Sequence, residues 1–543
     1  MSFENCRCIF LNHSEQNCGV YQFGKSIYSA VSSSTEITFI YAESINKGQF
    51  DDILSKNQNL DLMIVNFHPT TMPWLNRELI RALPFPCIGI IHEFDNLTCF
   101  SANADLFDFR IFPDPTIDAR MPTMFTTSRL APSFTPSIKA IEPSMPTIGS
   151  FGFGTPGKGF EKIVRLVEHE FDEALIRLLI TPNFYYDQDG TKARDIARKC
   201  FELVSKPGVR LEVTHEFLEE NQLIEFLSEN SVNVFLYENQ KGRGIASVID
   251  KAVAAGKPIA VSDSNMFRHI RTISSLFRVE EVPLAEIIRF GAKEVLKLKE
   301  NWTAENLTEQ YNDICRKVLF LWDSINDIST CRYNIILNDM ERDRYSLAIS
   351  HMKSLVPVSM TRKIERANVQ QAFVKEAVQN FVAGFSHKAN ILCVGSFEDT
   401  ASESLRMMGF KIEEIDPVLN YDLNTFYNLP KTIRSGYDII FSTSVIEHVP
   451  DDEKFIEQIR ELLAPGGIAI LTMDFKDCYR PGDPKPIVDM RLYTLQDILG
   501  RFLPLLNNCD VIDAPMWNDA TPDFFYEGVQ YSFATFVFKK RIS

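Results

Sequence analysis

The sequence is short of positive charge. Its 543 residues carry 56 Lys and Arg against 72 Asp and Glu, which gives a formal net charge of −16. Proteins that bind nucleic acid present a basic footprint, and proteins that bind anionic membranes carry a polybasic segment. The sequence contains neither feature, so we exclude nucleic acid as a partner.

The sequence also lacks paired cysteines and long apolar runs. None of its eleven cysteines forms a C-x-x-C pair, which argues against a zinc ribbon or a redox pair, and we predict no metal. The N-terminal segment MSFENCRCIF contains an acid and no long apolar stretch, unlike a signal peptide. Every apolar run is shorter than the ~18 residues of a membrane helix. We therefore expect a soluble, cytoplasmic protein without a transmembrane segment.

What the sequence does have is a repeated alternation of short apolar runs and amphipathic stretches. This alternation is typical of βαβ units and parallel sheets, and it occurs in three blocks. At roughly 150 residues per domain, the length also predicts several domains. We predict an α/β protein with Rossmann-like domains at residues 1–140, 141–330 and 386–543 and a helical linker at 331–385.

The candidate strands are short and apolar. They are CRCIFLN, EITFIYAE, LDLMIVNFH and CIGIIHEF in the first block, TIGSFGFG, ALIRLLIT, VRLEVTHEF, VNVFLYE and PIAVSD in the second, and NILCVG, KIEEIDP, YDIIFST and IAILTMDF in the third. The last apolar run, YSFATFVFKK, is predicted to be an edge strand.

The third block contains a candidate ligand-binding edge. Gly395 ends its first predicted strand, and Asp416 ends the second, 21 positions later (416 − 395). A glycine at a strand-to-helix turn lets backbone N–H groups approach a ligand, and an acid about 20 residues later can hold a ribose diol.

The third block contains a distinctive order of elements in the run YDIIFSTSVIEHVPDDEKFIEQIRELLAPGGIAILTMD. With its order of strand, Glu-His pair, helix, L-x-P-G-G and strand, the block resembles a class I S-adenosylmethionine-dependent methyltransferase. The resemblance implies that Asp416 holds the cofactor's ribose and Asp422 its adenine, while Ser442 and Glu447 line the cofactor. The first glycine-rich motif departs from the family pattern, because CVGSFED keeps only Gly395. Ser396 and Glu398 of this loop are further candidates, Glu398 or Asp399 for the methionine amine.

Methyl transfer to a hydroxyl requires in-line positioning and often a general base. His448 and Asp474, near the ends of successive predicted strands, are the candidates. The alternatives are a structural or cofactor-lining His448 and a solvated strand-end Asp474. The segment KDCYRPGDPKPIVDMRLYT is predicted to be an acceptor-binding loop, with an ordinary connector as the alternative.

The first two blocks contain a second set of candidates. IGSFGFGTPGKGFE places Gly154, Lys158 and Gly159 between a predicted strand and a helix. This segment resembles the donor-site Lys-Gly element of retaining glycosyltransferases with the GT-B fold, and the resemblance loosely covers residues 1–340. It implies a nucleotide sugar as donor substrate. The loop CGVYQFG, with Gly19 and Gly24, resembles the family's glycine-rich loop on the acceptor side.

Two histidines and a degenerate motif complete this set. His68 and His92 follow predicted strands at the rim where open α/β sheets bind ligands, although either could be structural. The GT-B family carries two glutamates eight positions apart around a Gly-x-Gly, whereas this sequence reads ENQKGRGIASVIDKAVAAGKP. The resemblance implies that the donor is bound at Gly242, Arg243, Gly244 and Asp250. The guanidinium of Arg243 would donate two hydrogen bonds to the diphosphate.

The sequence thus predicts a bifunctional enzyme of polysaccharide or glycan biosynthesis. The first 330 residues would transfer a sugar from a nucleotide sugar, and the C-terminal block would use S-adenosylmethionine to O-methylate a sugar hydroxyl. A polysaccharide assembly complex is the expected partner. Two alternatives remain: the GT-B half is an inactive glycan-binding or docking module, or the methyl acceptor is a lipid or small metabolite.

Overall fold

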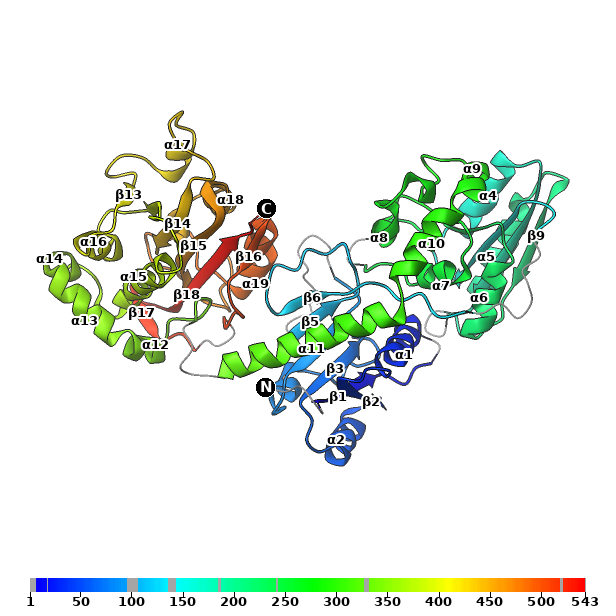
Figure 1. Cartoon of the computed structure of the whole chain (residues 1–543), viewed down its shortest axis with the longest axis horizontal. Coiled ribbons are helices and arrows are strands. Elements are labelled where there is room, and N and C mark those ends of the chain that lie inside the picture. Colours follow the sequence, from blue (N-terminus) through cyan, green and yellow to red (C-terminus); the bar gives the residue numbers. More distant parts are fainter. Residues whose placement is uncertain are drawn as a thin grey trace. The chain divides into compact units, whose positions relative to one another are not determined.

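The structure, a computed structural model, describes residues 6–16, 18–94, 106–134, 143–183, 187–240, 243–326, 332–517 and 521–542. The chain forms two compact units. Unit 1 comprises Met1–Asp118 and Thr123–Asp323, and unit 2 comprises Ala119–Pro122 and Ser324–Ser543. Both units are α/β, as the sequence predicts (Figure 1).

Unit 1 begins with a six-stranded sheet in the order β2-β1-β3-β4-β5-β6, in which all neighbours are parallel. The elements of this first domain are β1 (Cys6–Asn12), α1 (Gly19–Val31), β2 (Ile37–Glu43), α2 (Lys47–Lys56), β3 (Leu62–Phe67), α3 (Arg77–Arg81), β4 (Cys87–Ile91), β5 (Phe109–Phe112) and β6 (Met124–Thr126). Strands β3 and β4 are buried along their whole length, which is usual for the central strands of a parallel sheet.

The second domain of unit 1 is built on a five-stranded parallel sheet in the order β11-β10-β7-β8-β9. Its elements are β7 (Thr147–Phe153), α4 (Phe160–Glu170), β8 (Glu173–Thr181), α5 (Thr191–Leu203), β9 (Gly208–Thr214), α6 (Glu220–Ser228), β10 (Val232–Phe235), α7 (Val248–Ala255), β11 (Ile259–Val261), η2 (Asn265–Phe267), α8 (Arg268–Arg271), η3 (Ser275–Phe277), α9 (Leu284–Phe290) and α10 (Ala292–Asn301).

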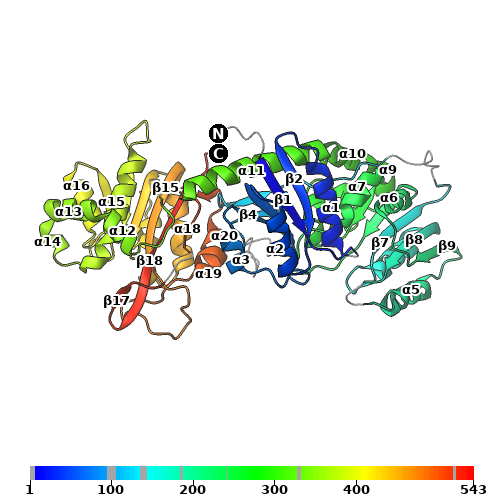
Figure 2. The same ribbon diagram turned by 90° about the horizontal axis from the view of Figure 1, so that it is seen from below.

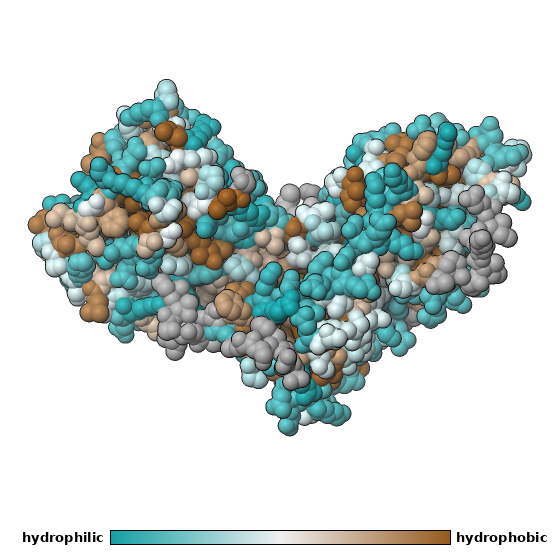
Figure 3. All heavy atoms as spheres, in the orientation of Figure 1, coloured by the Kyte–Doolittle hydropathy of each residue, from teal (hydrophilic) through white to brown (hydrophobic). Residues whose placement is uncertain are grey.

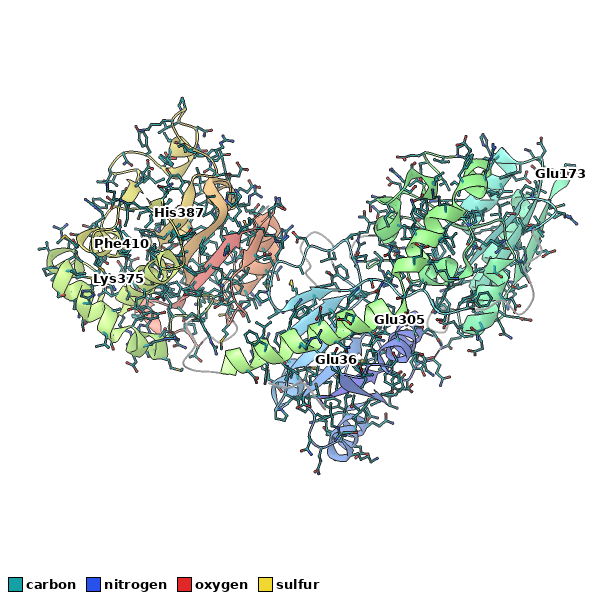
Figure 4. All side chains as sticks on the ribbon, viewed as in Figure 1. Glu36, Glu173, Glu305, Lys375, His387 and Phe410 are labelled. Carbon is teal, nitrogen blue, oxygen red and sulfur yellow. The ribbon has the colours of Figure 1, made fainter. Side chains whose placement is uncertain are left out.

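A long helix, α11 (Ala304–Asn326), leaves the second domain and returns to the first (Figures 1 and 2). The Thr308 hydroxyl donates to the carbonyl oxygen of Ala30 at 3.1 Å, and the Ser34 hydroxyl donates to Asn312 Oδ1 at 2.9 Å. Glu36, labelled in Figure 4, forms an ion pair with Arg316 of the same helix. The chain therefore crosses between the two domains more than once, which holds them together as one unit.

Unit 2 is built on a seven-stranded mixed sheet in the order β13-β12-β14-β15-β18-β16, with β17 paired to β18. Its elements are α12 (Asp339–Arg344), α13 (Ser346–Leu355), α14 (Pro357–Met360), η4 (Glu365–Ala367), α15 (Asn368–Val382), β12 (Ile391–Val394), α16 (Thr400–Met407), β13 (Ile412–Ile415), α17 (Leu423–Tyr427), β14 (Tyr437–Thr443), η5 (Ile446–His448), α18 (Asp452–Leu462), β15 (Leu463–Phe475), α19 (Leu495–Asp497), η6 (Ile498–Phe502), α20 (Leu503–Leu505), β16 (Cys509–Val511), β17 (Phe524–Tyr526) and β18 (Val529–Lys540).

The final strand corrects one prediction, because β18 is not an edge strand. It lies between β15 and β16 and is antiparallel to both. Residues 531–538 are buried without interruption, so both faces of the strand are covered. A run that is apolar on both faces fits an interior strand better than an edge, where one row of backbone groups faces solvent.

Helices α12–α15, which fall within residues 331–385, contribute to the core of unit 2. Phe373 and Val374 of α15 belong to the same buried cluster as Ile439 and Phe441 of β14. The segment is helical, as the sequence predicts, and it packs on the third sheet.

The surface seen in Figure 3 is mostly polar, with apolar residues scattered over it. This agrees with the net charge of −16. In the described part of the chain, every helix is too short or too polar to traverse a lipid bilayer.

Candidate functional site

Each of the three sheets has a point where the strand order reverses, and open α/β sheets bind ligands in the crevice at the carboxyl ends of such strands. The reversal lies between β1 and β3 in the first domain, between β7 and β10 in the second, and between β12 and β14 in unit 2. Many of the predicted site residues lie near the carboxyl ends of the strands of these sheets, in one place in unit 1 and one in unit 2.

The site in unit 1 is a cavity of about 980 Å³ lined by residues of both domains. The predicted residues that line it are Gly19, His68, His92, Lys158, Arg243, Gly244 and Asp250. The first residues of α1 and α7 and the loop that leads into α4 also contribute to the wall. Helix N-termini present free N–H groups and a partial positive charge, so this wall favours an anion.

Lys158 is the cation best placed for such an anion. Its Nζ lies 3.9 Å from the ring centroid of Tyr237, a cation–π contact. Burial, together with the weaker repulsion of the nearby Arg243 guanidinium, lowers the pKa of Lys158 to about 8. The ammonium is therefore mainly charged at neutral pH and loses its charge in mildly alkaline solution.

Asp250 and Arg129 form a buried ion pair between the two domains. Arg129 Nε donates to Asp250 Oδ1 at 2.9 Å, and Nη2 donates to Oδ2, so the pair is bidentate. Burial raises the pKa of Asp250, and the guanidinium opposes this rise. Both oxygens of the predicted donor-binding carboxylate are thus engaged by Arg129.

We expect the substitution Arg129→Met to destabilise the protein strongly. It would leave the Asp250 carboxylate buried without a counter-charge, and breaking a buried ion pair in this way costs about 3–5 kcal/mol. The thermal unfolding temperature of the full chain, with Arg198→Met as control, measures the effect. The control removes an exposed pair with Glu202 and should leave the temperature unchanged. Equal unfolding temperatures for the two variants would contradict the structural role of Arg129.

The two histidines of unit 1 that the sequence singles out, His68 and His92, are partly buried and neutral. His92 Nε2 lies 2.7 Å from Asn66 Oδ1. The amide nitrogen of Asn66 donates to Asn12 Oδ1 and to the carbonyl oxygen of Val20, so its oxygen faces the imidazole and His92 Nε2 is the donor. Burial lowers the pKa of His92 to about 3 and also lowers the pKa of His68. These rings can supply hydrogen bonds at neutral pH but no positive charge.

The predicted glycines of unit 1 play different parts. Gly159 has a φ of 74°, and a Cβ there would lie 2.0 Å from the carbonyl oxygen of Leu236, so only glycine fits before α4. A Cβ on Gly24 or Gly154 would meet atoms of neighbouring elements at 2.4 Å and 2.7 Å. Neither glycine lines the cavity, and both serve close packing. Gly242 lies outside the described residues.

The site in unit 2 begins at the carboxyl ends of β12 and β13. Gly395 has a φ of 83°, and a Cβ there would lie 2.4 Å from Val445 Cγ2. Asp416 accepts the backbone N–H of Phe397 at 3.2 Å and that of Val418 at 2.7 Å. The carboxylate therefore joins the loops after the first two strands of this sheet.

Other predicted cofactor residues surround this edge. Glu398 pairs with Arg362 at 3.2 Å, and the Ser442 hydroxyl donates to the carbonyl oxygen of Val394 at 2.9 Å. Asp422 caps α17 by accepting the N–H of Thr425 at 2.8 Å and its hydroxyl at 2.7 Å, and these bonds lower its pKa.

Several buried polar atoms at this edge have no partner among the described residues. They are Ser396 Oγ, Asp399 Oδ2 and Thr443 Oγ1. Buried polar atoms are rarely left unpaired, so these three suit a polar ligand such as the amino-acid portion of S-adenosylmethionine. Burial raises the pKa of Asp399, whose other oxygen caps α16 through the N–H of Ser402 at 2.6 Å.

A cluster of buried acids and one histidine follows β14 and β15. His448 Nδ1 lies 3.3 Å from Asp489 Oδ1 and 3.2 Å from the carbonyl oxygen of Val488. Asp489 hydrogen-bonds Asp474, which in turn interacts with Glu447. Burial raises the pKa of all three acids, that of Glu447 to about 7. One oxygen of each acid is buried without a partner among the described residues.

The structure thus brings two predicted catalytic residues, His448 and Asp474, into one cluster with the predicted cofactor residue Glu447. The residue that the sequence analysis missed is Asp489. It belongs to the predicted acceptor-binding loop, and its position as an acid between two apolar residues, Val488 and Met490, was the available signal.

Comparison with known proteins identifies the C-terminal part. The family model described as a methyltransferase domain matches residues 366–513, so the chain carries a methyltransferase domain in unit 2. A comparison with curated protein sequences finds no match.

Several solved structures are similar to the chain in its fold. Anabaena HepE in complex with UDP is 11% identical over 56% of this chain and 98% of its own, with a TM-score of 0.40. A glycosyltransferase from Rickettsia africae is 9% identical over 58% and 98%, and the UDP-forming trehalose-phosphate synthase of Burkholderia vietnamiensis is 12% identical over 58% and 98%. Both have a TM-score of 0.40. Unit 1 contains the two parallel-sheet, Rossmann-like domains that the sequence predicts.

Proposed function

We propose that the chain is a bifunctional transferase of polysaccharide or glycan biosynthesis. Unit 2 transfers a methyl group from S-adenosylmethionine to a sugar hydroxyl, and unit 1 transfers a sugar from a nucleotide sugar. The observation that carries the proposal is the His448–Asp489 pair, which lies beside buried acids in a methyltransferase domain. A methylated hydroxyl cannot be extended further, so the two reactions suit one assembly process.

His448 is the general base in this proposal. A carbonyl oxygen can only accept a hydrogen bond, so the contact with Val488 requires a proton on Nδ1 of the imidazole. The same proton faces Asp489. Neutral His448 therefore carries its lone pair on Nε2, which can remove the proton of a hydroxyl group.

The cofactor, once bound, supplies an electrophilic methyl group on a sulfonium. Asp416 would hold its ribose diol, and the unpartnered atoms of Ser396, Asp399 and Thr443 would receive its amino-acid portion. Glu447, Asp474 and Asp489 are buried beside His448, whose imidazole is 40% exposed and so open to an acceptor hydroxyl. Asp489, whose Oδ1 lies 3.3 Å from Nδ1, favours the positive charge that His448 gains as it takes up the proton.

In unit 1, Lys158 and the helix N-termini would bind the diphosphate of the donor. Positive charge there stabilises the negative charge that develops on the leaving diphosphate. His68 and His92, both neutral, would position the sugars through hydrogen bonds. Arg243 forms an ion pair with Glu93 across the cavity, so it reaches the diphosphate only if that pair opens.

We expect Lys158→Met to weaken nucleoside diphosphate binding by about 10- to 50-fold, because one charge-assisted hydrogen bond is lost. The affinity of the unmodified chain should fall as the pH rises through about 8, where Lys158 loses its charge. Isothermal titration between pH 7 and 9.5 measures both effects. Lys162→Met is the control, since Lys162 is exposed and outside the cavity lining. A pH-independent affinity would contradict the role of Lys158.

The location and partner of the enzyme are part of the proposal. The nine cysteines in the described part of the chain are free thiols, which agrees with a reducing compartment such as the cytoplasm. A complex that assembles polysaccharide is the partner that would supply the acceptor.

The ion pair between Asp250 and Arg129 favours a second candidate function. The Asp250 carboxylate, predicted to bind the donor, is bound to Arg129 instead. This favours a unit 1 that binds a glycan, or docks the methyltransferase domain to a complex, and does not catalyse sugar transfer. Hydrolysis of sugar nucleotides by the full chain separates the two functions. Release of nucleoside diphosphate supports the transferase, and its absence despite nucleotide binding supports the module.

A further inference from the structure

Two residues that line the unit 1 cavity carry a buried polar atom without a hydrogen-bond partner among the described residues. They are His68, at Nδ1, and Tyr237, at its hydroxyl. His68 already has a place in the proposed function, where it positions a sugar. Tyr237 follows β10 in the second domain and was not among the predicted site residues. Buried polar atoms are rarely left unpaired, so a hydroxyl in this position suits a bond that forms only with a ligand.

The ring of Tyr237 is fixed by the fold, which gives its hydroxyl a defined position. Tyr237 is 4% exposed and belongs to a buried cluster with Phe235 and Phe267. Its ring centroid lies 5.0 Å from that of Phe267. The carbonyl oxygen of Tyr237 accepts the Ser262 hydroxyl at 2.7 Å, which anchors the backbone. Packing therefore holds the side chain in place without a hydrogen bond to its hydroxyl.

The Tyr237 side chain lies at the same part of the cavity wall as the Lys158 ammonium. A Cβ on Gly152, which lines the cavity at the end of β7, would lie 3.4 Å from the Tyr237 hydroxyl oxygen. Lys158 Nζ lies over the face of the same ring, 3.9 Å from its centroid. One ring thus has a cation on its face and an unpaired hydroxyl at its edge. A diphosphate carries several oxygens, so it can meet both groups at once.

The chemistry of the hydroxyl suits this anion. Burial raises the pKa of Tyr237, so the hydroxyl keeps its proton at neutral pH and can donate it in a hydrogen bond. A hydrogen bond to a charged phosphate oxygen is roughly twice as strong as one between neutral groups. In the free protein, the same hydroxyl is a buried group without a described partner, which costs free energy.

We propose that Tyr237 is a donor-site residue, and that its hydroxyl donates a hydrogen bond to the diphosphate bound by Lys158. The inference rests on the proposed function, since it assumes that a nucleoside diphosphate occupies this cavity. The ammonium attracts the diphosphate, and the hydroxyl, held on a fixed ring, orients it. Lys158 and Tyr237 together then stabilise the diphosphate as it leaves the sugar.

The substitution Tyr237→Phe tests the proposal, because it removes the hydroxyl and keeps the ring beneath Lys158. Isothermal titration of the full chain with UDP, GDP, CDP, ADP and dTDP identifies the nucleotide that binds. For that nucleotide, we expect Tyr237→Phe to lower the affinity about tenfold, through the loss of one charge-assisted hydrogen bond. The unfolding temperature without ligand should stay the same or rise, because the lost hydroxyl is unpaired in the described structure. A fall in that temperature would show that the hydroxyl serves the fold, and would overturn the proposal.

Tyr311 on α11 provides a matched control. Its hydroxyl is also buried and has no hydrogen-bond partner in the described part of the chain, but Tyr311 is not part of the cavity lining. Tyr311→Phe should therefore keep or raise the unfolding temperature, as Tyr237→Phe does, and leave the nucleotide affinity unchanged. Equal losses of affinity in the two variants would show an indirect effect and contradict the assignment of Tyr237.

Two further results separate this inference from the proposed function. Inorganic pyrophosphate should displace the nucleotide and should lose affinity by the same factor in Tyr237→Phe. Pyrophosphate that does not compete, or that loses no affinity, would overturn the assignment to the diphosphate. Nucleotide binding that Tyr237→Phe leaves unchanged would overturn the inference and leave the donor site intact. If none of the five nucleotides binds, the inference and the proposed donor site are both wrong.

Discussion

Replacing His448 with alanine is expected to lower kcat for methyl transfer by about 10²- to 10⁴-fold, the usual contribution of a general base. The binding of S-adenosylmethionine should persist, because Asp416 and the loop after β12 are untouched. The reason for the large effect is the geometry of the imidazole. Nδ1 is held by Asp489 and the carbonyl oxygen of Val488, so the lone pair of Nε2 is the group that removes the proton.

A matched control is available on α13. His351 is exposed in the same unit and lies outside the cluster, so His351→Ala should retain full activity. Formation of S-adenosylhomocysteine from a panel of sugar acceptors measures kcat. Asp489→Asn should lower kcat without raising KM for the cofactor, since it disturbs the orientation of His448. Unchanged kcat in His448→Ala would show that the imidazole is not the base.

Replacing Asp416 with alanine is expected to weaken S-adenosylhomocysteine binding by about 100-fold or more. Two hydrogen bonds from a ribose diol to a carboxylate account for a loss of this size. Asp416 also accepts the N–H groups of Phe397 and Val418, so its removal loosens both loops of the edge. The loss of the ribose contacts and the loosening of the loops both weaken cofactor binding.

Two controls separate binding from folding. Asp416→Asn keeps the size of the side chain and retains an acceptor for one backbone N–H, so it should fold while binding more weakly than the unmodified chain. Asp451 caps α18 by accepting the N–H of Lys454 at 3.1 Å, and Asp451→Ala should leave the cofactor affinity unchanged. Circular dichroism checks the fold of each variant, and calorimetry measures the affinity. Full affinity in Asp416→Ala would refute the ribose assignment.

Much of the fold follows from local patterns in the sequence. The apolar runs at the starts of the three blocks became strands of three sheets, because alternation of apolar runs with amphipathic stretches is a local property. The prediction for β18 was wrong because position within a sheet depends on which strands pair. The burial of residues 531–538 on both faces reveals that pairing only in the folded chain.

The limits of prediction are clearest at the site in unit 1. The sequence places Asp250 near a glycine-rich loop, yet its partner Arg129 lies 121 positions away. Whether a carboxylate is free or paired depends on such long-range contacts. The same holds in unit 2, where Asp489 reaches His448 from 41 positions away (489 − 448) by folding of the loop after β15.

The central claim is that one chain carries two independent sites, one for a nucleoside diphosphate and one for S-adenosylmethionine. Calorimetric titration of the full chain with S-adenosylhomocysteine and with a panel of nucleoside diphosphates tests it most directly. We predict binding of both ligands, with Lys158→Met losing affinity only for the nucleotide and Asp416→Ala only for S-adenosylhomocysteine. Binding of S-adenosylhomocysteine without any nucleotide, or loss of both ligands in either folded variant, would contradict the account.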